Sequence, residues 1–155
     1  MSEAAVEAGR AERIAEHLVK EGFRPKIEDG DVGLKYEGYP LWVVLSEKDA
    51  TYYRVMCFGI WPVETDVERR AAYQAASEVG KGTKGVKLFL DDDDVTASVD
   101  MLAPDVESLL KVLVRGIELC GAGVVRFGNA AQRILEEAES DDSDDSGDES
   151  APEKL

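Results

Sequence analysis

The segment VKLFLDDDDVTASVDML, residues 86–102, is the clearest β-hairpin in the chain, with four consecutive aspartates between two alternating stretches. Apolar side chains recur at every second position on both sides of the aspartates, which is the period of a half-buried strand. If Leu90 lies opposite Val95, the two strands place these apolar side chains on one face: Val86, Leu88, Leu90, Val95, Ala97 and Val99. We therefore predict a hairpin with one buried face and a loop at Asp91–Asp94.

The four aspartates have two interpretations, a metal site and a turn. Four adjacent carboxylates could coordinate a hard cation such as Ca²⁺ or Mg²⁺, which takes oxygen ligands. A calcium loop, however, spaces its acids at alternate positions, with a glycine at the sharp bend and a distant glutamate, and this pattern is absent from residues 88–102. Aspartate is also favoured in turns, because its carboxylate accepts hydrogen bonds from nearby backbone N–H groups. We favour the turn, with weak metal binding as the alternative, and predict no metal ligand and no cofactor.

The residues before the hairpin, 65–82, are predicted to form a helix. Thr65 and Glu68 have the spacing of a capping box, in which each side chain satisfies a free backbone N–H group. The apolar stripe of this helix is narrow and consists mostly of small residues: Val67, Ala71, Ala75 and Val79. Such a stripe buries little area, so we expect the helix to pack weakly or against a partner.

Further upstream, the sequence predicts a helix followed by antiparallel strands. Residues 2–21 carry an apolar stripe with helical spacing that includes Ile14 and Leu18. After this helix the apolar period changes to two, and turn residues separate the strands expected near Ile27 and at 32–36, 40–46 and 51–59. Antiparallel pairing of neighbouring strands is the simplest topology for such a series.

Downstream of the hairpin, a long helix is predicted to start at Pro104, a residue that suits a first turn. Its apolar positions repeat every seven residues in two lines: Val106, Leu113, Cys120, Phe127 and Ile134, and Leu110, Ile117, Val124 and Ala131. Small residues form a seam beside these lines: Leu109, Gly116, Gly123 and Ala130. The apolar face is therefore wide, and Gly121-Ala122-Gly123 is the point at which the helix could kink or split.

Charge is unevenly distributed along the chain. The formal net charge is −15, of which residues 136–155 carry −9 and residues 1–135 carry −6. The last residues, SDDSDDSGDESAPEKL, have almost no apolar side chains to offset the entropy of ordering. We predict a single α+β domain over residues 1–139, with its first residues frayed, and a disordered acidic tail over 140–155. A negative field disfavours nucleic acid and anionic membranes as partners and favours basic proteins.

The sequence points to a cytoplasmic protein. The first ten residues do not have the pattern of a signal peptide, and no stretch approaches the roughly 20 apolar residues of a membrane span. Cys57 and Cys120 lie among apolar residues without a metal-ligand or CxxC spacing. We interpret them as buried free thiols in a reducing compartment.

Nothing in the sequence predicts an enzyme. His17, the single histidine, has no cysteine or acidic partner at the spacing of a catalytic triad or a metal site. The segment GKGTKG, residues 80–85, lacks the spacing of a phosphate-binding loop and is interpreted as a flexible connector. We therefore predict no catalytic residue and find no indication of a small-molecule substrate.

The middle strands, 40–46 and 51–59, have apolar side chains on both faces. With helices on one side of an antiparallel sheet, the other side should face water and be polar. Without a second cover, this side of the sheet would be an exposed apolar patch. We therefore expect it to be covered by the helix at 65–82, by a second subunit or by a partner protein. The residues that we assign to partner binding are Trp42, Val44, Tyr52, Met56 and Phe58.

The order of elements, with a helix, several strands, a helix, a hairpin and a long helix, is that of an α+β sandwich. Three segments make the chain resemble the YbjN-type domain, described as a bacterial sensory transduction regulator: HLVKEGFRPKIEDGDVGLKYEG (17–38), AAYQAASEV with KGVKLFLDDDDVTASVDML (71–102), and LLKVLVRGIEL (109–119). The resemblance covers about residues 10–136. It implies the fold of type III secretion chaperones, in the order α-β-β-β-β-α-β-β-α, and a non-enzymatic, cytoplasmic, dimeric protein-binding module.

Two functions follow as hypotheses. In the first, a partner segment or a second subunit binds the strand surface around Trp42 and Phe58, by main-chain pairing or by burial of side chains in pockets. In the second, the acidic tail and the loop at 91–94 sequester a basic protein, which predicts binding that weakens steeply with salt.

Overall fold

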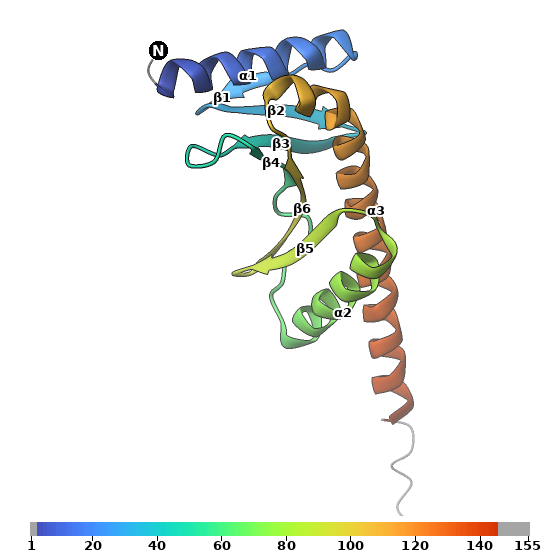
Figure 1. Cartoon of the computed structure of the whole chain (residues 1–155). Coiled ribbons are helices and arrows are strands. Elements are labelled where there is room, and N and C mark those ends of the chain that lie inside the picture. Colours follow the sequence, from blue (N-terminus) through green and yellow to red (C-terminus); the bar gives the residue numbers. More distant parts are fainter. Residues whose placement is uncertain (1–2, 146–155) are drawn as a thin grey trace, which may run out of the picture.

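A computed structural model of the chain describes residues 3–145, with the backbone alone described for residues 3–8, 144 and 145. Over these residues the chain forms three helices and six strands in the predicted order (Figure 1). The elements are α1 (Glu3–Lys20), β1 (Lys26–Glu28), β2 (Asp31–Tyr36), β3 (Tyr39–Leu45), β4 (Tyr52–Cys57), α2 (Asp66–Gly82), β5 (Val86–Asp91), β6 (Asp94–Leu102) and α3 (Val106–Asp145). The chain is therefore an α+β protein, as its sequence predicted.

The strands form one antiparallel sheet in the spatial order β1-β2-β3-β4-β6-β5. Two-residue turns join β1 to β2 at Asp29-Gly30 and β2 to β3 at Glu37-Gly38, and all four turn residues have positive φ. Such turns match the twist of antiparallel strands, and glycine adopts positive φ without strain. The predicted antiparallel pairing of neighbouring strands is confirmed for β1 to β4.

The hairpin of β5 and β6 has the register that the sequence predicted but a tighter turn. Leu90 lies opposite Val95, and the other apolar residues of the two strands pair as expected. Asp91 and Asp94, which we had assigned to the loop, pair with each other at the ends of the strands. The two residues between them form the turn, and Asp92 has a φ of 53°, which aspartate tolerates better than most residues. The predicted loop was too long because two residues are enough to close an antiparallel pair.

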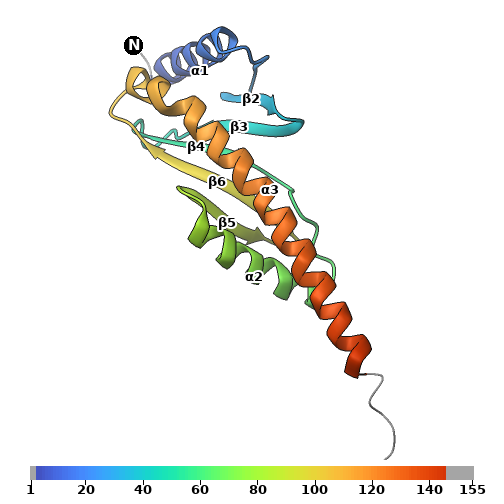
Figure 2. The same cartoon turned by 90° about the vertical axis from the view of Figure 1, so that its right-hand side faces the viewer.

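The inner face of the sheet is apolar and packs against the helices. Every second residue of the strands points toward this core: Val32, Leu34, Leu41, Val43, Tyr53, Val55, Cys57, Val86, Ala97 and Val99. Helix α3 packs against it along the first part of both predicted seven-residue lines, up to Val124, and the later positions of the lines pack with α2. Figure 2 shows this helix crossing the sheet diagonally. Helix α1 contributes Ala11, Ile14 and Leu18 at the end where β1 and β2 lie.

Helix α3 is continuous through Gly121-Ala122-Gly123, the point that the sequence offered for a kink or a split. The two glycines instead allow the helix to approach the sheet closely. A Cβ atom at Gly121 would lie 2.6 Å from the ring of Tyr36, and one at Gly123 would lie 2.6 Å from Cγ1 of Val86. A larger side chain does not fit in such a space. Each glycine makes the helix less favourable by about 1 kcal/mol against alanine, and the close packing that it allows offsets this cost.

Both ends of α3 differ from the sequence prediction. The helix begins at Val106 rather than at Pro104, because Asp105 Oδ1 caps it by accepting a hydrogen bond from the Ser108 backbone N–H at 2.8 Å. At its other end the helix continues through residues 140–145, which we had assigned to the disordered tail. Extending an existing helix adds one hydrogen bond per residue without a new nucleation cost, so it can continue past its last core contacts. Residues 146–155 of the predicted tail lie outside the described residues.

Helix α2 packs on α3 and β5, on the inner side of the sheet. Half of its predicted capping box is present, since Thr65 Oγ1 accepts a hydrogen bond from the Glu68 backbone N–H at 3.1 Å. The Glu68 carboxylate accepts a hydrogen bond from the Thr65 hydroxyl at 2.9 Å and not from the predicted backbone N–H. The small side chains Ala71, Ala72, Ala75 and Val79 are buried against Phe127, Ala130, Ala131 and Ile134 of α3. Of the two expectations for α2, packing against a partner was therefore wrong, because small side chains let α2 and α3 come close enough to bury one another.

Candidate protein-binding face

The outer face of the sheet carries no helix within the described chain. Because side chains alternate along a strand, the pairing that points Val43 and Val55 inward turns Trp42, Val44 and Met56 outward. Helix α2 does not cover these residues, because its apolar stripe packs on α3 and on the inner side of the hairpin. Figure 2 shows α2 beside α3 at the β5 end of the sheet. Of the three covers that the sequence suggested, α2 is thus excluded, and a second subunit and a partner protein remain.

Four of the five residues predicted to bind a partner lie together on this outer face. Trp42 pairs directly with Met56 across β3 and β4, and Val44 and Tyr52 lie on the same strands. Trp42, Val44 and Tyr52 are half-buried, whereas Met56 is only 4% exposed and lies beneath its neighbours. Phe58 follows the last residue of β4 and is 50% exposed. The face therefore offers aromatic surface to a partner, while Met56 supports that surface from below.

The indole of Trp42 occupies a defined position on this face. Its six-membered ring lies over Gly33, the residue opposite it on β2, and a Cβ atom at Gly33 would be 2.9 Å from the ring. Lys26 of β1 pairs with Gly33 on the other side, and its Nζ lies 5.3 Å from the centroid of the Trp42 ring, a cation–π contact. A glycine usually weakens a strand, but here it makes room for the ring.

The opposite half of the outer face, on β4, β6 and β5, carries Phe89 and the exposed Leu102 together with a group of polar side chains that pair with one another. Lys87 Nζ donates a hydrogen bond to Asp100 Oδ2 at 2.8 Å, and Ser98 Oγ donates one to Asp100 Oδ1 at 2.7 Å. Burial by itself would raise the pKa of Asp100, but hydrogen bonds from Lys87, Ser98 and Tyr52 outweigh it and hold that pKa below its ordinary value. Burial, together with the hydrogen bond to Asp100, raises the pKa of the Tyr52 phenol. These polar groups satisfy one another, so they offer a partner less than the half around Trp42.

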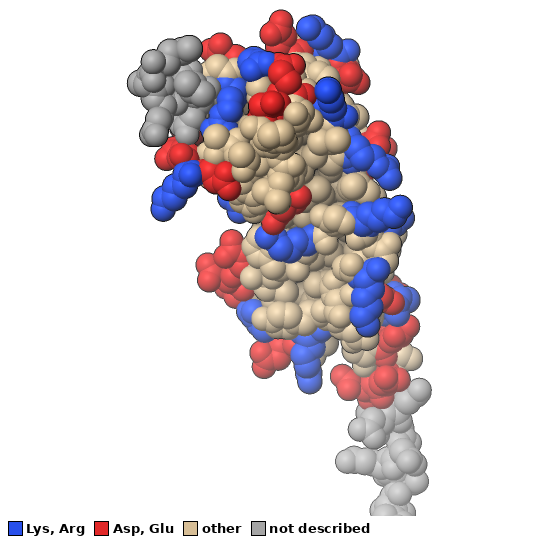
Figure 3. Space-filling view, viewed as in Figure 1, with Lys and Arg blue, Asp and Glu red and all other residues tan. Residues whose placement is uncertain are grey.

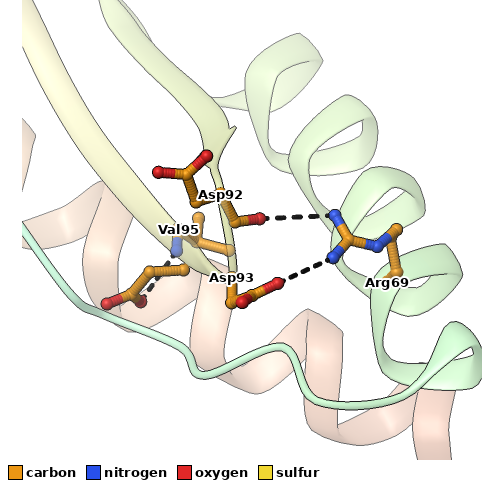
Figure 4. Close-up of polar contacts among 5 residues, drawn as sticks. Arg69, Asp92, Asp93 and Val95 are labelled. Atoms are coloured by element: carbon orange, nitrogen blue, oxygen red, sulfur yellow. Dashed lines mark hydrogen bonds and ion pairs between the residues drawn. The ribbon is translucent and has the colours of Figure 1, made fainter.

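Three of the four aspartates of the hairpin make contacts with α2 or with the backbone, as Figure 4 shows for Asp92 and Asp93. Arg69 of α2 donates a hydrogen bond to the carbonyl oxygen of Asp92 at 3.4 Å and another to the carboxylate of Asp93 at 3.1 Å. Asp94 Oδ1 accepts a hydrogen bond from the Val95 backbone N–H at 2.8 Å. Among the described residues, no group of three or more His, Cys, Asp or Glu side chains is arranged to hold a metal ion. This geometry supports the turn interpretation.

The other reactive side chains lie in ordinary surroundings. Cys57 and Cys120 are free and buried, and burial raises their pKa values to about 11 and about 12. Both thiols are therefore protonated near neutral pH and are poor nucleophiles. His17 lies on α1 with its Nε2 atom 4.0 Å from the Glu21 carboxylate. Residues 80–82 of the segment GKGTKG form the end of α2, and only residues 83–85 connect it to β5, so the interpretation of the whole segment as a flexible connector was wrong for its first half.

Charged side chains of both signs are spread over the surface in Figure 3. Lys and Arg side chains are frequent on the right-hand side of that view, where α3 lies, and acidic side chains occur at both ends of the molecule. The negative charge is thus not gathered into one patch on the side of the molecule that Figure 3 shows. No helix in the described part of the chain is long and apolar enough to cross a lipid bilayer.

A groove at the β1 end of the outer face was not predicted from the sequence. It has a volume of about 470 Å³ and is lined by residues 22–24, 26, 33–35 and 40–42. Trp42 is the one residue of this lining that the sequence had assigned to binding. The available signal was Gly33, because a glycine inside a strand often marks the close approach of another group.

Comparison with known proteins identifies the family. The YbjN family model, described as "Putative bacterial sensory transduction regulator", matches residues 10–120. The fold is similar to that of YbjN from E. coli, described as "a putative transcription regulator", with a TM-score of 0.59 and 14% identity over 78% of this chain and 92% of that chain. It is also similar to an uncharacterized protein from Methanothermobacter thermautotrophicus, with a TM-score of 0.54 and 13% identity over 83% and 98% of the two chains. No curated protein sequence matches the chain.

A weaker likeness links the chain to the Yersinia pestis type III secretion chaperone SycH, whose structure holds a stable fragment of YscM2. The TM-score is 0.43 and the identity 10%, over 75% of this chain and 98% of that chain. The sequence resemblance to the YbjN domain is thus confirmed, whereas the likeness to SycH is too low to bear on function.

Proposed function

We propose that this chain, which belongs to the YbjN family, is a non-enzymatic protein-binding module of the bacterial cytoplasm with a regulatory or chaperone-like role. The partner, either a segment of another protein or a second copy of the chain, binds the outer face of the sheet. The observation that carries the proposal is the uncovered aromatic surface: Trp42 and Tyr52 are half-buried on this face, and Phe58 beside it is 50% exposed. Soluble proteins seldom leave a contiguous apolar patch uncovered unless it takes part in binding.

The position of Trp42 also favours a binding role. Tryptophan and tyrosine are enriched among the residues that dominate binding energy at protein interfaces. The Trp42 ring is already held over Gly33 and against Lys26, so it loses little conformational freedom when a partner covers it.

The alternative, capture of a basic protein by the acidic tail and the 91–94 loop, has less support. The carboxylate of Asp93 is already engaged by Arg69, and that of Asp94 by the Val95 backbone N–H. The alternative therefore depends on the loop carboxylates of Asp91 and Asp92 and on the charge of the last residues, and it predicts association that salt weakens.

The first test is the solution mass of the full chain, measured by light scattering at low and high salt. The variant combines Trp42→Ser with Phe58→Ser. The matched control combines Tyr73→Ser with Val125→Ser, which removes two apolar side chains, 59% and 41% exposed, from α2 and α3. We expect a dimer at both salt concentrations that the variant loses and the control keeps, because apolar burial is insensitive to screening.

Where the wild type is monomeric, peptides selected from a random library replace the second copy as the ligand. Selected peptides should bind the wild type and the control alike and bind the Trp42 and Phe58 variant at least about tenfold more weakly, which corresponds to the loss of one strong interface residue. Circular dichroism and thermal melting establish that the variants are folded. Association that survives both substitutions and disappears at high salt would contradict the proposal and support the acidic tail.

A further inference from the structure

The groove beside Trp42, lined by residues 22–24, 26, 33–35 and 40–42 and called the edge groove below, has the size of a small-molecule site. Its volume of about 470 Å³ lies within the range of roughly 300–1,000 Å³ that ligand pockets span. Three separate segments build it: the connection from α1 to β1, the second half of β2, and the first half of β3. It is thus a product of the tertiary fold and not a local feature of one loop.

Part of the lining is flat and apolar. The Trp42 ring lies over Gly33, which has no side chain to interrupt the surface, and Phe23 and Pro40 contribute further apolar area. Phe23 is itself supported by Tyr36, with the ring centroids 6.5 Å apart. A planar ligand could stack against such a surface, since aromatic faces favour offset stacking in addition to the area they bury.

The charged side chains of the groove are all cationic. Arg24, Lys26 and Lys35 belong to its described lining, which contains no acidic residue. Lys26 is partly neutralised by Glu28 at 3.2 Å. Arg24 and Lys35, in contrast, make no ion pair or side-chain hydrogen bond with any other residue of the described chain. Three cations gathered in one hollow of a protein with a net charge of −15 create a local field that attracts an anion.

A backbone donor lies at the same place. Strand β1 begins at Lys26, opposite Gly33, so the pairing of the two strands goes no further in that direction. Strand β2 continues to Tyr36 without a partner on that side. Glu28 and Asp31 close a two-residue turn and are therefore a hydrogen-bonded pair. Hydrogen-bonded positions recur at every second residue of an antiparallel strand, so Asp31, Gly33 and Lys35 direct their backbone groups toward the β1 side. The N–H group of Lys35 therefore points to the open edge.

From these features we propose that the edge groove binds a small organic anion with a planar apolar body, such as an aromatic carboxylate. The planar body stacks on Trp42 and Phe23, and the anionic group is bound by Arg24, Lys35 and Lys26. The proposal goes beyond the protein-binding role and does not depend on it. Because Trp42 belongs both to the groove and to the outer face, a bound anion would compete with a protein partner for this residue.

An acidic peptide would meet the same cations but differs in what else it needs. It would pair along the open edge of β2 and extend beyond the groove in both directions. The volume of the groove matches one small molecule, so the free anion is the occupant that we propose. Peptide binding is an outcome that the experiment can distinguish.

The test is a calorimetric titration of the full chain with naphthoate, and with naphthalenemethanol as the ligand of the same shape without charge. The variant combines Arg24→Glu with Lys35→Glu. The control combines Lys48→Glu with Lys84→Glu, which changes the net charge equally at two exposed residues outside the groove. We expect the wild type and the control to bind naphthoate alike. Binding should weaken at least about tenfold when the ligand has no charge, as in naphthalenemethanol, and when the charges of the groove are reversed, as in the variant, because charge-assisted hydrogen bonds are then lost.

Amide NMR shifts locate the ligand independently of the variants, and thermal melting confirms that each variant is folded. We expect the largest shifts at residues 22–26, 33–35 and 40–42. No binding of naphthoate, equal binding of the two ligands, or unchanged binding by the variant would overturn the proposal. Tighter binding of an acidic peptide, with shifts along the whole of β2, would replace the small anion by a protein segment. None of these failures affects the proposed protein-binding role, which is measured as solution mass.

Discussion

The two faces of the sheet are built from adjacent residues but differ in what covers them. On β3, Val43 is completely buried in the core, while Val44, the next residue, is half-buried on the outer face. Helices of the same chain cover the inner face, so its apolar side chains contribute directly to the free energy of unfolding. The outer face has no such cover in the described chain, so its apolar side chains contribute less to folding and remain open to binding. The comparison separates the residues that hold the fold from the candidates for function.

The largest expected difference is between Val43→Ala and Val44→Ala, which remove the same atoms from opposite faces of one strand. We expect Val43→Ala to lower the free energy of unfolding by about 2 kcal/mol, because it loses buried methyl groups and leaves a cavity. For Val44→Ala we expect a loss of less than about 1 kcal/mol, because its methyl groups are already partly in water. Urea denaturation of dilute protein measures both values. Equal losses would mean that Val44 is as deeply buried in solution as Val43, as it would be in a tight dimer.

The contact between the inner face and α3 can be tested with two glycines of that helix. At Gly123 a Cβ atom would be 2.6 Å from Val86, so Gly123→Ala should destabilise the protein by about 1 kcal/mol or more despite its better helix propensity. At Gly128 a Cβ atom meets nothing within 4 Å, so Gly128→Ala should stabilise the protein by up to about 1 kcal/mol. Shifts of the melting temperature in opposite directions are expected. Stabilisation by both substitutions would contradict the close approach of α3 to β5.

The smallest expected effect concerns the paired polar side chains of the outer face. The pKa of Asp100 is below its ordinary value in the folded state, so the ionised carboxylate stabilises the fold above that ordinary value of 3.8. This contribution is lost as the pH falls through the folded-state pKa. Wild type should therefore be slightly more stable than Asp100→Asn near neutral pH, and the difference should shrink as the pH falls below about 4.

Chemical denaturation over a pH series measures this difference, with Asp92→Asn in the exposed hairpin turn as the control. If Asp100→Asn and Asp92→Asn show the same pH dependence, the hydrogen bonds from Lys87, Ser98 and Tyr52 to Asp100 do not stabilise the folded protein.

Local periodicity explains how much of the fold could be predicted. The register of Leu90 opposite Val95 and the seven-residue lines of α3 follow from alternation and from helical repeat, which are properties of neighbouring residues. The turn at Asp92 and the start of α3 were misplaced by one or two residues, because competing turn and cap geometries differ little in local energy. The prediction that α2 packs against a partner was wrong, because a stripe of alanines does not reveal which surface it will pack on.

In the candidate site, too, some features follow from local sequence patterns and others do not. Alternation groups Trp42 with Val44 on one strand and Tyr52 with Met56 on the other, but only the strand pairing shows that the two groups share the outer face. The edge groove could not be assigned, because Arg24, Lys35 and Trp42 come from three segments whose distance in space depends on the pairing of β1, β2 and β3. Only Gly33, a glycine inside a strand, pointed toward it.

The sequence by itself determined the order of the elements, the pairing within the hairpin and the buried side of the long helix. Each of these depends on the repeat of apolar side chains along a few turns or one strand, and burial of apolar surface acts on that repeat directly. Only the tertiary structure decided which face of the sheet the three helices cover, how closely α3 approaches it at Gly121 and Gly123, and where Arg24, Lys26 and Lys35 gather around Trp42. These features depend on how distant segments fit together in three dimensions, and no local pattern in the chain encodes that fit.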